Sequence, residues 1–278
     1  MKHYYLAYIV FVGSFLCAFA ETQDTALKSA RELLEEGYQQ FTSGYSDKAL
    51  DTFSEVIRLD SENLDARMGQ ALIFAQLERH KDAFEAYDWI TRRNPGNSNA
   101  WNGRGLAAFN LENFDEALAS FEKSIADQPL NGFFYESIAW TQMCLGEFKK
   151  AAESAKQASL MYDRKGETSL YPLLIAFFSY HESGDSENAL RTLQYASTGK
   201  SGNRWPAPVI DYLNNRINEA ELISFVSNLA SVYSNTCGST SHLNWVSTHG
   251  DPQVFEYTLA RALKVQADAV PTRNLSSL

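Results

Sequence analysis

The chain repeats itself with a period of thirty-four positions, and this period constrains its fold more than any other feature of the sequence. Four alanines in similar polar surroundings stand at that spacing: Ala49, Ala83, Ala117 and Ala151. An aromatic residue follows each of the first three by four positions: Phe53, Tyr87 and Phe121. A small residue precedes every one of the four by twelve positions: Gly37, Ala71, Gly105 and Ala139. Periods of this length indicate a stack of repeated structural units.

Each copy of the repeat carries the apolar spacing of an α-helix. Apolar residues recur every three or four positions, as in Ala117, Phe121 and Ile125, which predicts a helix with one buried face. We expect two helices per copy, joined by tight turns such as residues 111–113 and 145–147. A single helix pair cannot bury its apolar face, whereas stacked pairs share a continuous core. The fold class is therefore predicted as all-α.

A fifth copy surrounds Ala189, which follows Ala151 at a longer interval than the regular period, with a surplus of four positions. The surplus is expected in the polar stretch 163–168. Beyond residue 198 the repeat is no longer regular. We predict a solenoid over residues 25–198, a helical extension with a degenerate sixth repeat or capping helices over 205–266, and a flexible tail over 267–278.

The third copy resembles a tetratricopeptide repeat (TPR). Six residues occupy the signature positions of that family in register: Trp101, Gly105, Phe114, Ala117, Phe121 and Pro129. The resemblance covers residues 27–197. It departs from the family pattern at Leu33, which stands where the third copy has Trp101, and at Ala155, where an aromatic residue is usual. The resemblance implies a solenoid of helical hairpins that acts as a protein-binding scaffold.

In TPR folds the first helix of each pair lines a concave groove, and the resemblance implies the same here. The residues that project onto that side are mostly aromatic, aliphatic or amide side chains: Tyr38, Met68, Leu72, Asn99, Asn102, Leu106, Asn110, Glu136, Trp140, Met143, Tyr171 and Phe178. Aromatic rings and methionine offer adaptable contact area, and asparagine can bond a peptide backbone as donor and as acceptor. We expect this groove to bind a peptide segment or helix of a partner protein. The scarcity of Lys and Arg argues against a clamp for a terminal carboxylate.

Two alternatives apply to these groove residues. In the first alternative, some of the groove residues belong to the core. In the second, the C-terminal helices fold back and cover the groove residues. If the groove binds a partner, exchanging Trp140 and Asn102 for alanine is expected to weaken binding while thermal stability stays nearly intact. A second hypothesis for the whole protein is self-association, in which the concave face or the C-terminal hairpin forms a homodimer.

The N-terminus has the features of a secretory signal peptide. Lys2 precedes an uncharged stretch over residues 4–20, which closes with Ala18 and Ala20 at positions −3 and −1. We predict cleavage after Ala20 and export, to a periplasm or outside the cell. An uncleaved anchor helix is the alternative. Lipid attachment at Cys17 is not expected, because Leu16 precedes it where a small residue is normally required.

The sequence gives little support for an enzyme or a nucleic-acid-binding protein. Acidic residues outnumber basic ones by 34 to 24, for a net charge of −10, whereas a nucleic-acid surface needs clustered Lys and Arg. No phosphate-binding glycine loop or nucleophile elbow occurs. Cys237, His242 and His249 are the one candidate metal set, and their spacing fits no structural zinc pattern. We therefore expect no cofactor, no metal and no enzymatic activity.

Two further expectations concern the C-terminal part. Its helical pattern, with Leu222, Phe225 and Leu229 on one face, is similar to the C-terminal half of bacterial envelope TPR adaptor proteins. Cys144 and Cys237 remain after signal cleavage, and the sequence leaves open whether they form a disulfide. The simpler interpretation is that Cys144 is packed within a helix.

Overall fold

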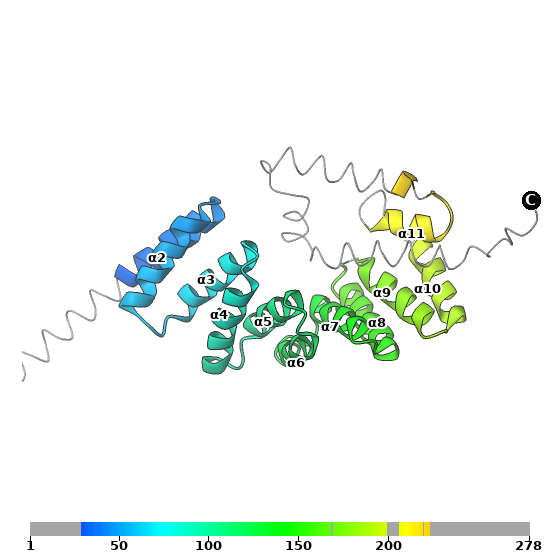
Figure 1. The fold of residues 1–278 in the computed structure, drawn as a ribbon, viewed down its shortest axis with the longest axis horizontal. Coiled ribbons are helices and arrows are strands. Elements are labelled where there is room, and N and C mark those ends of the chain that lie inside the picture. Colours follow the sequence, from blue (N-terminus) through cyan, green and yellow to red (C-terminus); the bar gives the residue numbers. More distant parts are fainter. Residues whose placement is uncertain (1–28, 168, 199–205, 219, 223–278) are drawn as a thin grey trace, which may run out of the picture. The chain divides into compact units, whose positions relative to one another are not determined.

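The computed structural model describes residues 29–167, 169–198, 206–218 and 220–222, and within these ranges the chain is helical without any β-strand (Figure 1). This confirms the all-α fold class. Residues 29–42 form the first described helix. The helices that follow are α2 (Ser46–Leu59), α3 (Leu64–Gln76), α4 (His80–Arg93), α5 (Ser98–Asn110), α6 (Phe114–Ser124), α7 (Gly132–Cys144), α8 (Phe148–Arg164), α9 (Tyr171–Glu182), α10 (Ser186–Thr198) and α11 (Ala207–Leu213).

The turns within the helix pairs share one backbone conformation. In each, one residue adopts a positive φ between 56° and 82°: Gly44, Glu78, Glu112, Gly146 and Gly184. The next residue donates its backbone N–H to the carbonyl five positions earlier, as from Asn113 to Ala108 at 2.9 Å and from Glu147 to Gln142 at 2.8 Å. This hydrogen bond satisfies a carbonyl that the helix end would otherwise leave unpaired. The two predicted turns, 111–113 and 145–147, lie where the sequence placed them.

The connections between the first four helix pairs also repeat. Asn63, Asn97 and Asn131 are spaced by one repeat period, and each side-chain oxygen accepts a backbone N–H at the start of the following helix, at 2.9, 2.9 and 3.2 Å. Such caps satisfy donors at the helix N-terminus. The fourth pair differs, because α8 has 17 residues whereas α4 has 14. Part of the surplus expected in the 163–168 loop is therefore an extension of α8.

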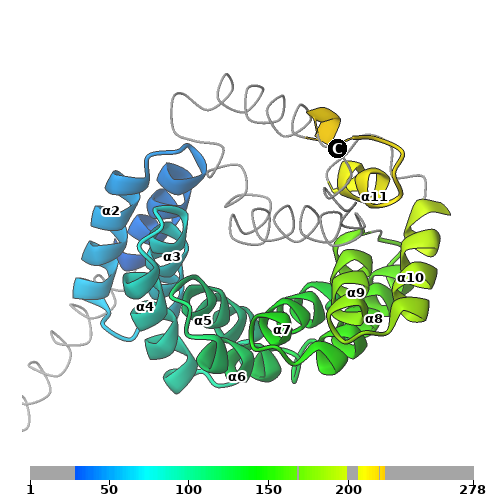
Figure 2. The ribbon, with the colours of Figure 1, turned by 45° about the vertical axis from the view of Figure 1, so that its right-hand side comes forward.

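The chain divides into two compact units, Met1–Arg104 and Gly105–Leu278, with the boundary inside α5. In unit 1, α3 packs against both α2 and α4. In unit 2, the helices from α6 to α10 pack each on the next, α7 also packs on α9, and α11 packs on α10. Figure 2 shows α7 and α9 in one row and α8 and α10 in the other. Successive hairpins thus bury one another's apolar faces, as a repeat stack requires.

The periodic alanines occupy equivalent, fully enclosed places in this stack. Ala49, Ala83, Ala117 and Ala151 are each 0 % exposed. The aromatic residue four positions later packs against glycine on a facing first helix. A Cβ atom added to Gly69 would lie 2.5 Å from the Phe53 ring, and one added to Gly105 would lie 2.5 Å from the Phe121 ring. The helix backbone approaches the aromatic ring so closely that only a small residue fits at these positions of the repeat.

Several sequence predictions fall outside the described residues. These are the signal peptide over residues 1–20, nearly all of the degenerate repeat, the tail, and the candidate metal ligands Cys237, His242 and His249. The start of the extension is described: α11 begins at Ala207 after Pro206 and contains Pro208 in its first turn. Within the described ranges, every helix is too short or too polar to cross a bilayer.

Candidate protein-binding face

The predicted binding residues can be compared at one repeat position, because Tyr38, Leu72, Leu106, Trp140 and Phe178 occupy equivalent places in the five copies. We call this the Leu72 position. Its exposure differs greatly along the chain. Leu72 is 39 % exposed, whereas Trp140 is 3 % and Phe178 is 1 % exposed. Tyr38 and Leu106 are half-buried.

The remaining predicted residues follow the same trend. Met68 and Asn102 are half-buried, and Asn99 is exposed. The Oδ1 atom of Asn102 is buried and accepts no hydrogen bond from the described residues. In unit 2, Asn110 and Tyr171 are half-buried, whereas Glu136 and Met143 are 8 % and 1 % exposed. Among these predicted residues, the exposed side chains are Leu72 on α3 and Asn99 in the first part of α5.

Burial changes how this face can be tested. Trp140 cannot be exchanged for alanine without a loss of stability, because truncating an enclosed aromatic side chain typically costs about 3–5 kcal/mol. The expectation that the Trp140 and Asn102 double exchange would leave thermal stability nearly intact is therefore wrong. The cause is the 3 % exposure of Trp140. Its role in partner binding stays a prediction.

Tyr38 joins the first described helix to α3. Its hydroxyl group donates a hydrogen bond to the backbone carbonyl of Asp65 at 2.9 Å, and its ring meets the Phe53 ring edge-on at 5.1 Å. Burial, with a smaller contribution from the Asp65 charge, raises the pKa of Tyr38 above its usual value. Tyr38 therefore remains a neutral donor at physiological pH, and part of its surface is already used within the fold.

Glu136 is a buried carboxyl group that links three segments of unit 2. Its Oε2 atom accepts hydrogen bonds from the Tyr162 hydroxyl on α8 at 3.0 Å and from Ser169, just before α9, at 3.4 Å. Burial raises the pKa of Glu136 to about 7, although the two hydrogen bonds act in the opposite direction. The pKa of Tyr162 is also raised, first by burial and then by the nearby charge of Glu136. No cation among the described residues pairs with this carboxylate, so its protonation state is sensitive near neutral pH.

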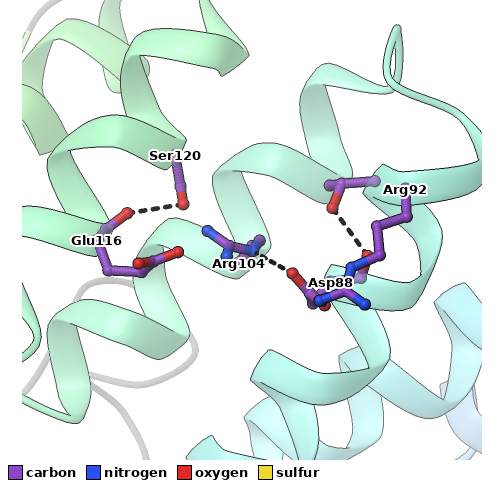
Figure 3. Close-up of polar contacts among 6 residues, drawn as sticks. Asp88, Arg92, Arg104, Glu116 and Ser120 are labelled. Carbon is purple, nitrogen blue, oxygen red and sulfur yellow. Dashed lines mark hydrogen bonds and ion pairs between the residues drawn. The ribbon is translucent and has the colours of Figure 1, made fainter.

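A cluster of charged residues in unit 1 has a structural role. Asp88 on α4 lies between Arg104 on α5 and Arg92, with nitrogen–oxygen distances of 3.0 and 2.6 Å (Figure 3). The Arg104 guanidinium also stacks over the Phe84 ring at 4.5 Å. In unit 2, the Ser120 hydroxyl donates to the backbone carbonyl of Glu116 at 2.8 Å (Figure 3). These contacts join or brace helices and do not assemble a nucleophile with a base.

A recurring contact explains one signature residue of the repeat. The Trp101 indole N–H donates to the carbonyl of Pro95 at 2.8 Å, and one period further along the chain the Tyr135 hydroxyl donates to the carbonyl of Pro129 at 3.2 Å. Each bond ties the first helix of a pair to the proline turn before it. Tyr135 was not among the predicted structural positions, although its spacing from Trp101 by one repeat period was visible in the sequence.

Metal ligation receives no geometric support in the part of the chain that the structure describes. There, no three His, Cys, Asp or Glu side chains gather closely enough to hold an ion. Cys144 is partly buried at the end of α7. Its possible disulfide partner, Cys237, lies outside the described residues, so the disulfide question stays open.

The stacked hairpins, their common turns and the buried alanines define a helical-repeat scaffold of the solenoid type. Residues 34–88 and 82–132 match the family model described as tetratricopeptide repeat. Residues 34–132 are thus similar to tetratricopeptide repeats, as the signature residues of the sequence indicated. No curated protein matches the chain in sequence.

Solved structures of TPR proteins share this fold. MamA is 17 % identical, with a TM-score of 0.57 over 60 % of this chain and 89 % of MamA. MamA from Desulfovibrio magneticus RS-1 is 15 % identical, with a TM-score of 0.56 over 61 % of this chain and 93 % of the other. YrrB, a TPR protein with an unusual peptide-binding site, is 16 % identical, with a TM-score of 0.54 over 59 % of this chain and 82 % of YrrB. At these identities the likeness is one of fold. TPR domains are protein–protein interaction modules, which is the coarse function this fold supports.

Proposed function

We propose that the protein is a non-enzymatic adaptor that binds a peptide segment or helix of a partner protein through the first helices of its repeats. The observation that carries this proposal is the exposure of Leu72 on α3, at 39 %, with Met68 one turn earlier on the same helix. An apolar side chain that the repeat leaves open offers contact area to a partner. The exposed amide of Asn99 on α5 presents donor and acceptor groups to a partner. The description of YrrB as a protein with a peptide-binding site supports the same mode of binding.

The test compares two double variants of the full-length protein. Leu72→Ala with Asn99→Ala alters the proposed face, and Leu190→Ala with Gln194→Ala alters exposed residues of α10 on the second helix of a pair. All four side chains are exposed, so both variants should keep the unfolding midpoint of the natural protein. Partners are captured from extracts of the source cells and quantified by mass spectrometry.

We expect the natural protein and the α10 variant to retain a common set of partners, and the Leu72 variant to recover at most a tenth of it. Equal recovery of partners by the two variants would show that the face with Leu72 and Asn99 does not bind them.

Self-association is the competing function, and sedimentation velocity distinguishes it. The adaptor proposal predicts a monomer at concentrations from 1 to 50 micromolar, roughly the range over which weak homodimers form. A concentration-dependent dimer that the Leu72 variant abolishes would show that the face binds a second copy of the chain.

We also propose that the protein is exported and that residues 1–20 are removed. The support is the basic start, the uncharged stretch and the alanines before Glu21 in the sequence. The similarity to bacterial envelope adaptors also stays a proposal. The intact mass of protein recovered from its native source should correspond to a chain that begins at Glu21. A mass that includes residues 1–20 would favour the anchor helix instead.

A further inference from the structure

The second copy of the repeat carries arginine where the third and fourth copies carry an aromatic residue. Arg67 on α3 precedes Trp101 by one period, and Tyr135 follows Trp101 by one period. Trp101 and Tyr135 each donate a hydrogen bond to the carbonyl of the proline in the turn before their helix. The Nε atom of Arg67 is enclosed but has no acceptor among the described residues. The second copy therefore holds a charged donor that the fold leaves without a hydrogen bond, which is costly for a buried group.

The Arg67 guanidinium lies over the ring of Trp89 on α4. Its central carbon is 4.6 Å from the centroid of that ring, and the central carbon of the Arg93 guanidinium, in the last turn of α4, is 3.8 Å from it. The face of an indole ring attracts cations, so one ring holds two positive charges close together. Contact with the ring also restricts both arginine side chains, which lowers the entropy that they lose when they bind a ligand.

One carboxylate accompanies these two cations. Glu62, in the turn before α3, accepts two hydrogen bonds from Arg93, with Nε–Oε2 and Nη2–Oε1 distances of 2.7 and 3.4 Å. The pKa of Glu62 is lowered, first by the hydrogen bond from Arg93 and further by the charges of Arg93 and Arg67. Arg67 forms no ion pair of its own with the described residues. Two guanidinium groups thus share one carboxylate, and a second carboxylate would complete the set.

This cluster can be reached from solvent. The side chains of Arg93 and Glu62 are 40 % and 65 % exposed, and Arg67 and Trp89 are half-buried. Arginine and tryptophan are enriched among the residues that dominate protein–protein binding, and a guanidinium can hold a carboxylate through two parallel hydrogen bonds. The net charge of −10 disfavours a polyanion such as nucleic acid. A single carboxylate among uncharged residues meets much less repulsion.

We propose that Arg67, Trp89 and Arg93 form a binding site for the carboxylate of an Asp or Glu side chain in a partner protein. The incoming carboxylate accepts hydrogen bonds from Arg67, as Glu62 accepts them from Arg93. At roughly 3.6 residues per turn, Arg67 and Leu72 point about 140° apart on α3, so this site is separate from the face with Leu72 and Asn99. The inference goes beyond the proposed function, because it assigns a second site and the residue type that the site takes.

The test measures the binding of three hexapeptides to the full-length protein. Each peptide is acetylated at its N-terminus and amidated at its C-terminus, and five of its residues are glycine or serine. The remaining residue is Glu in the first peptide, Gln in the second and phosphoserine in the third. Binding is followed by the indole N–H signal of Trp89 in nitrogen-15 NMR spectra, which is assigned by its loss in the Trp89→Phe variant. The dissociation constant of each peptide is obtained from the titration.

Three variants accompany the natural protein. Arg67→Gln removes the guanidinium that has no ion-pair partner. Arg58→Gln is the matched control, because it makes the same change of charge on α2 at an arginine that is already paired with Glu55. Glu62→Gln removes the carboxylate that the two guanidinium groups share. The unfolding midpoint of each variant shows that it is folded under the conditions of the titration.

We expect the natural protein to bind the Glu peptide about tenfold more tightly than the Gln peptide, and no less tightly than the phosphoserine peptide, whose second negative charge is repelled by Glu62. Arg67→Gln should abolish the preference for Glu over Gln, and Arg58→Gln should keep it. Glu62→Gln should bind the Glu peptide about threefold or more tightly than the natural protein does, because it frees Arg93 for the ligand.

Equal binding of the Glu and Gln peptides by the natural protein would overturn the proposal. An equal loss of binding in the Arg58 and Arg67 variants would also overturn it, because the attraction would then come from positive charge in general. Tighter binding of the phosphoserine peptide would replace the carboxylate by a phosphate group as the ligand. The adaptor proposal is tested separately through Leu72 and Asn99, so that the failure of one proposal can be told from the failure of the other.

Discussion

At the scale of single residues, the aromatic ring of each of the first three repeats lies against glycine. Tyr87 is 3 % exposed, and a Cβ atom added to Gly103 would lie 2.4 Å from its ring. Because Tyr87 is enclosed, the ring cannot move away without disturbing its other contacts. The repeat therefore depends on a residue without a side chain as much as on its bulky ones.

We predict that Gly103→Ala lowers the free energy of unfolding by about 1–3 kcal/mol, the usual range for an overpacked core. Urea denaturation followed by circular dichroism measures the change. Gly96→Ala is the matched control, because an added Cβ there meets only the end of the Asn94 side chain, at 3.8 Å. If the Gly103 variant and the natural protein had the same free energy of unfolding, α4 and α5 would be able to move apart without loss of stability.

Glu136 gives the fold a dependence on pH. Its pKa is about 7 in the folded protein and 4.5 in a model peptide, so the folded state holds the proton more tightly than the unfolded state. The contribution of Glu136 to the free energy of unfolding is greatest below its pKa in the unfolded chain, and it is lost as the pH rises toward 7. A difference of this size corresponds to on the order of 3 kcal/mol.

The Glu136→Gln variant removes the titration and keeps an oxygen that accepts the Tyr162 hydroxyl. We expect the free energy of unfolding of this variant, relative to the natural protein, to rise by on the order of 3 kcal/mol between pH 4.5 and pH 8. Urea titrations at several pH values measure both proteins, and the effects of all other groups cancel in the difference. If the free energies of unfolding of the two proteins changed with pH in the same way over this range, the raised pKa of Glu136 would be contradicted.

At the scale of the elements, the hairpin turns place non-glycine residues in a strained conformation. Glu112 has a φ of 60° in the turn between α5 and α6, and Gly146 has a φ of 75° at the same point of the next hairpin. The left-handed region is costly for a residue with a Cβ atom and is accessible to glycine. No atom lies within 4 Å of a Cβ added to Gly146, so the backbone alone decides the effect.

We predict opposite effects from opposite exchanges at this turn position. Glu112→Gly should raise the free energy of unfolding by about 1 kcal/mol, and Gly146→Ala should lower it by about 1 kcal/mol. Thermal unfolding of the two variants and the natural protein provides the measurement. A shift in the same direction for both would mean that the turn conformation does not determine stability here.

Much of this element structure was predictable because the period repeats it. The buried alanines and the turns at 111–113 and 145–147 follow from spacing alone. The caps at Asn63, Asn97 and Asn131 were not predicted, although their spacing is as regular as that of the alanines. The extension of α8 to Arg164 was assigned to a loop, because polar composition does not distinguish a solvated last helical turn from a loop.

The candidate site was predictable only in part. Repeat position shows which side of a helix a residue faces, and it placed Leu72 and Trp140 on the same side. It does not show how completely that side is enclosed, because burial depends on every neighbouring part of the fold and not on the repeat position alone. The different exposures of Leu72 and Trp140 therefore required the three-dimensional structure.

At the scale of the whole molecule, a stack of hairpins transmits instability mainly to its neighbours. The helices pack chiefly on those that adjoin them along the chain, so coupling decreases with each intervening repeat. Phe53 is 0 % exposed in the first hairpin, between Gly37 and Gly69. It is thus a suitable place to weaken one end of the stack.

We predict that Phe53→Ala lowers the stability of its own repeats by about 3–5 kcal/mol. Hydrogen exchange followed by mass spectrometry should show faster exchange in residues 29–93 and unchanged exchange in α9 and α10. Phe121→Ala, in the third repeat, is the comparison, and its effect should centre on α5–α7. Uniform acceleration along the whole chain would instead indicate a single cooperative unit.

The shared turn conformation has a consequence for how such a protein can be lengthened. Five successive hairpins each turn through one residue of positive φ and close on the same hydrogen bond. Cutting at two equivalent turns therefore leaves ends of matching geometry, which can be rejoined after one whole module has been deleted or duplicated. The number of repeats is thereby free to change by complete modules, while the joints between them stay the same.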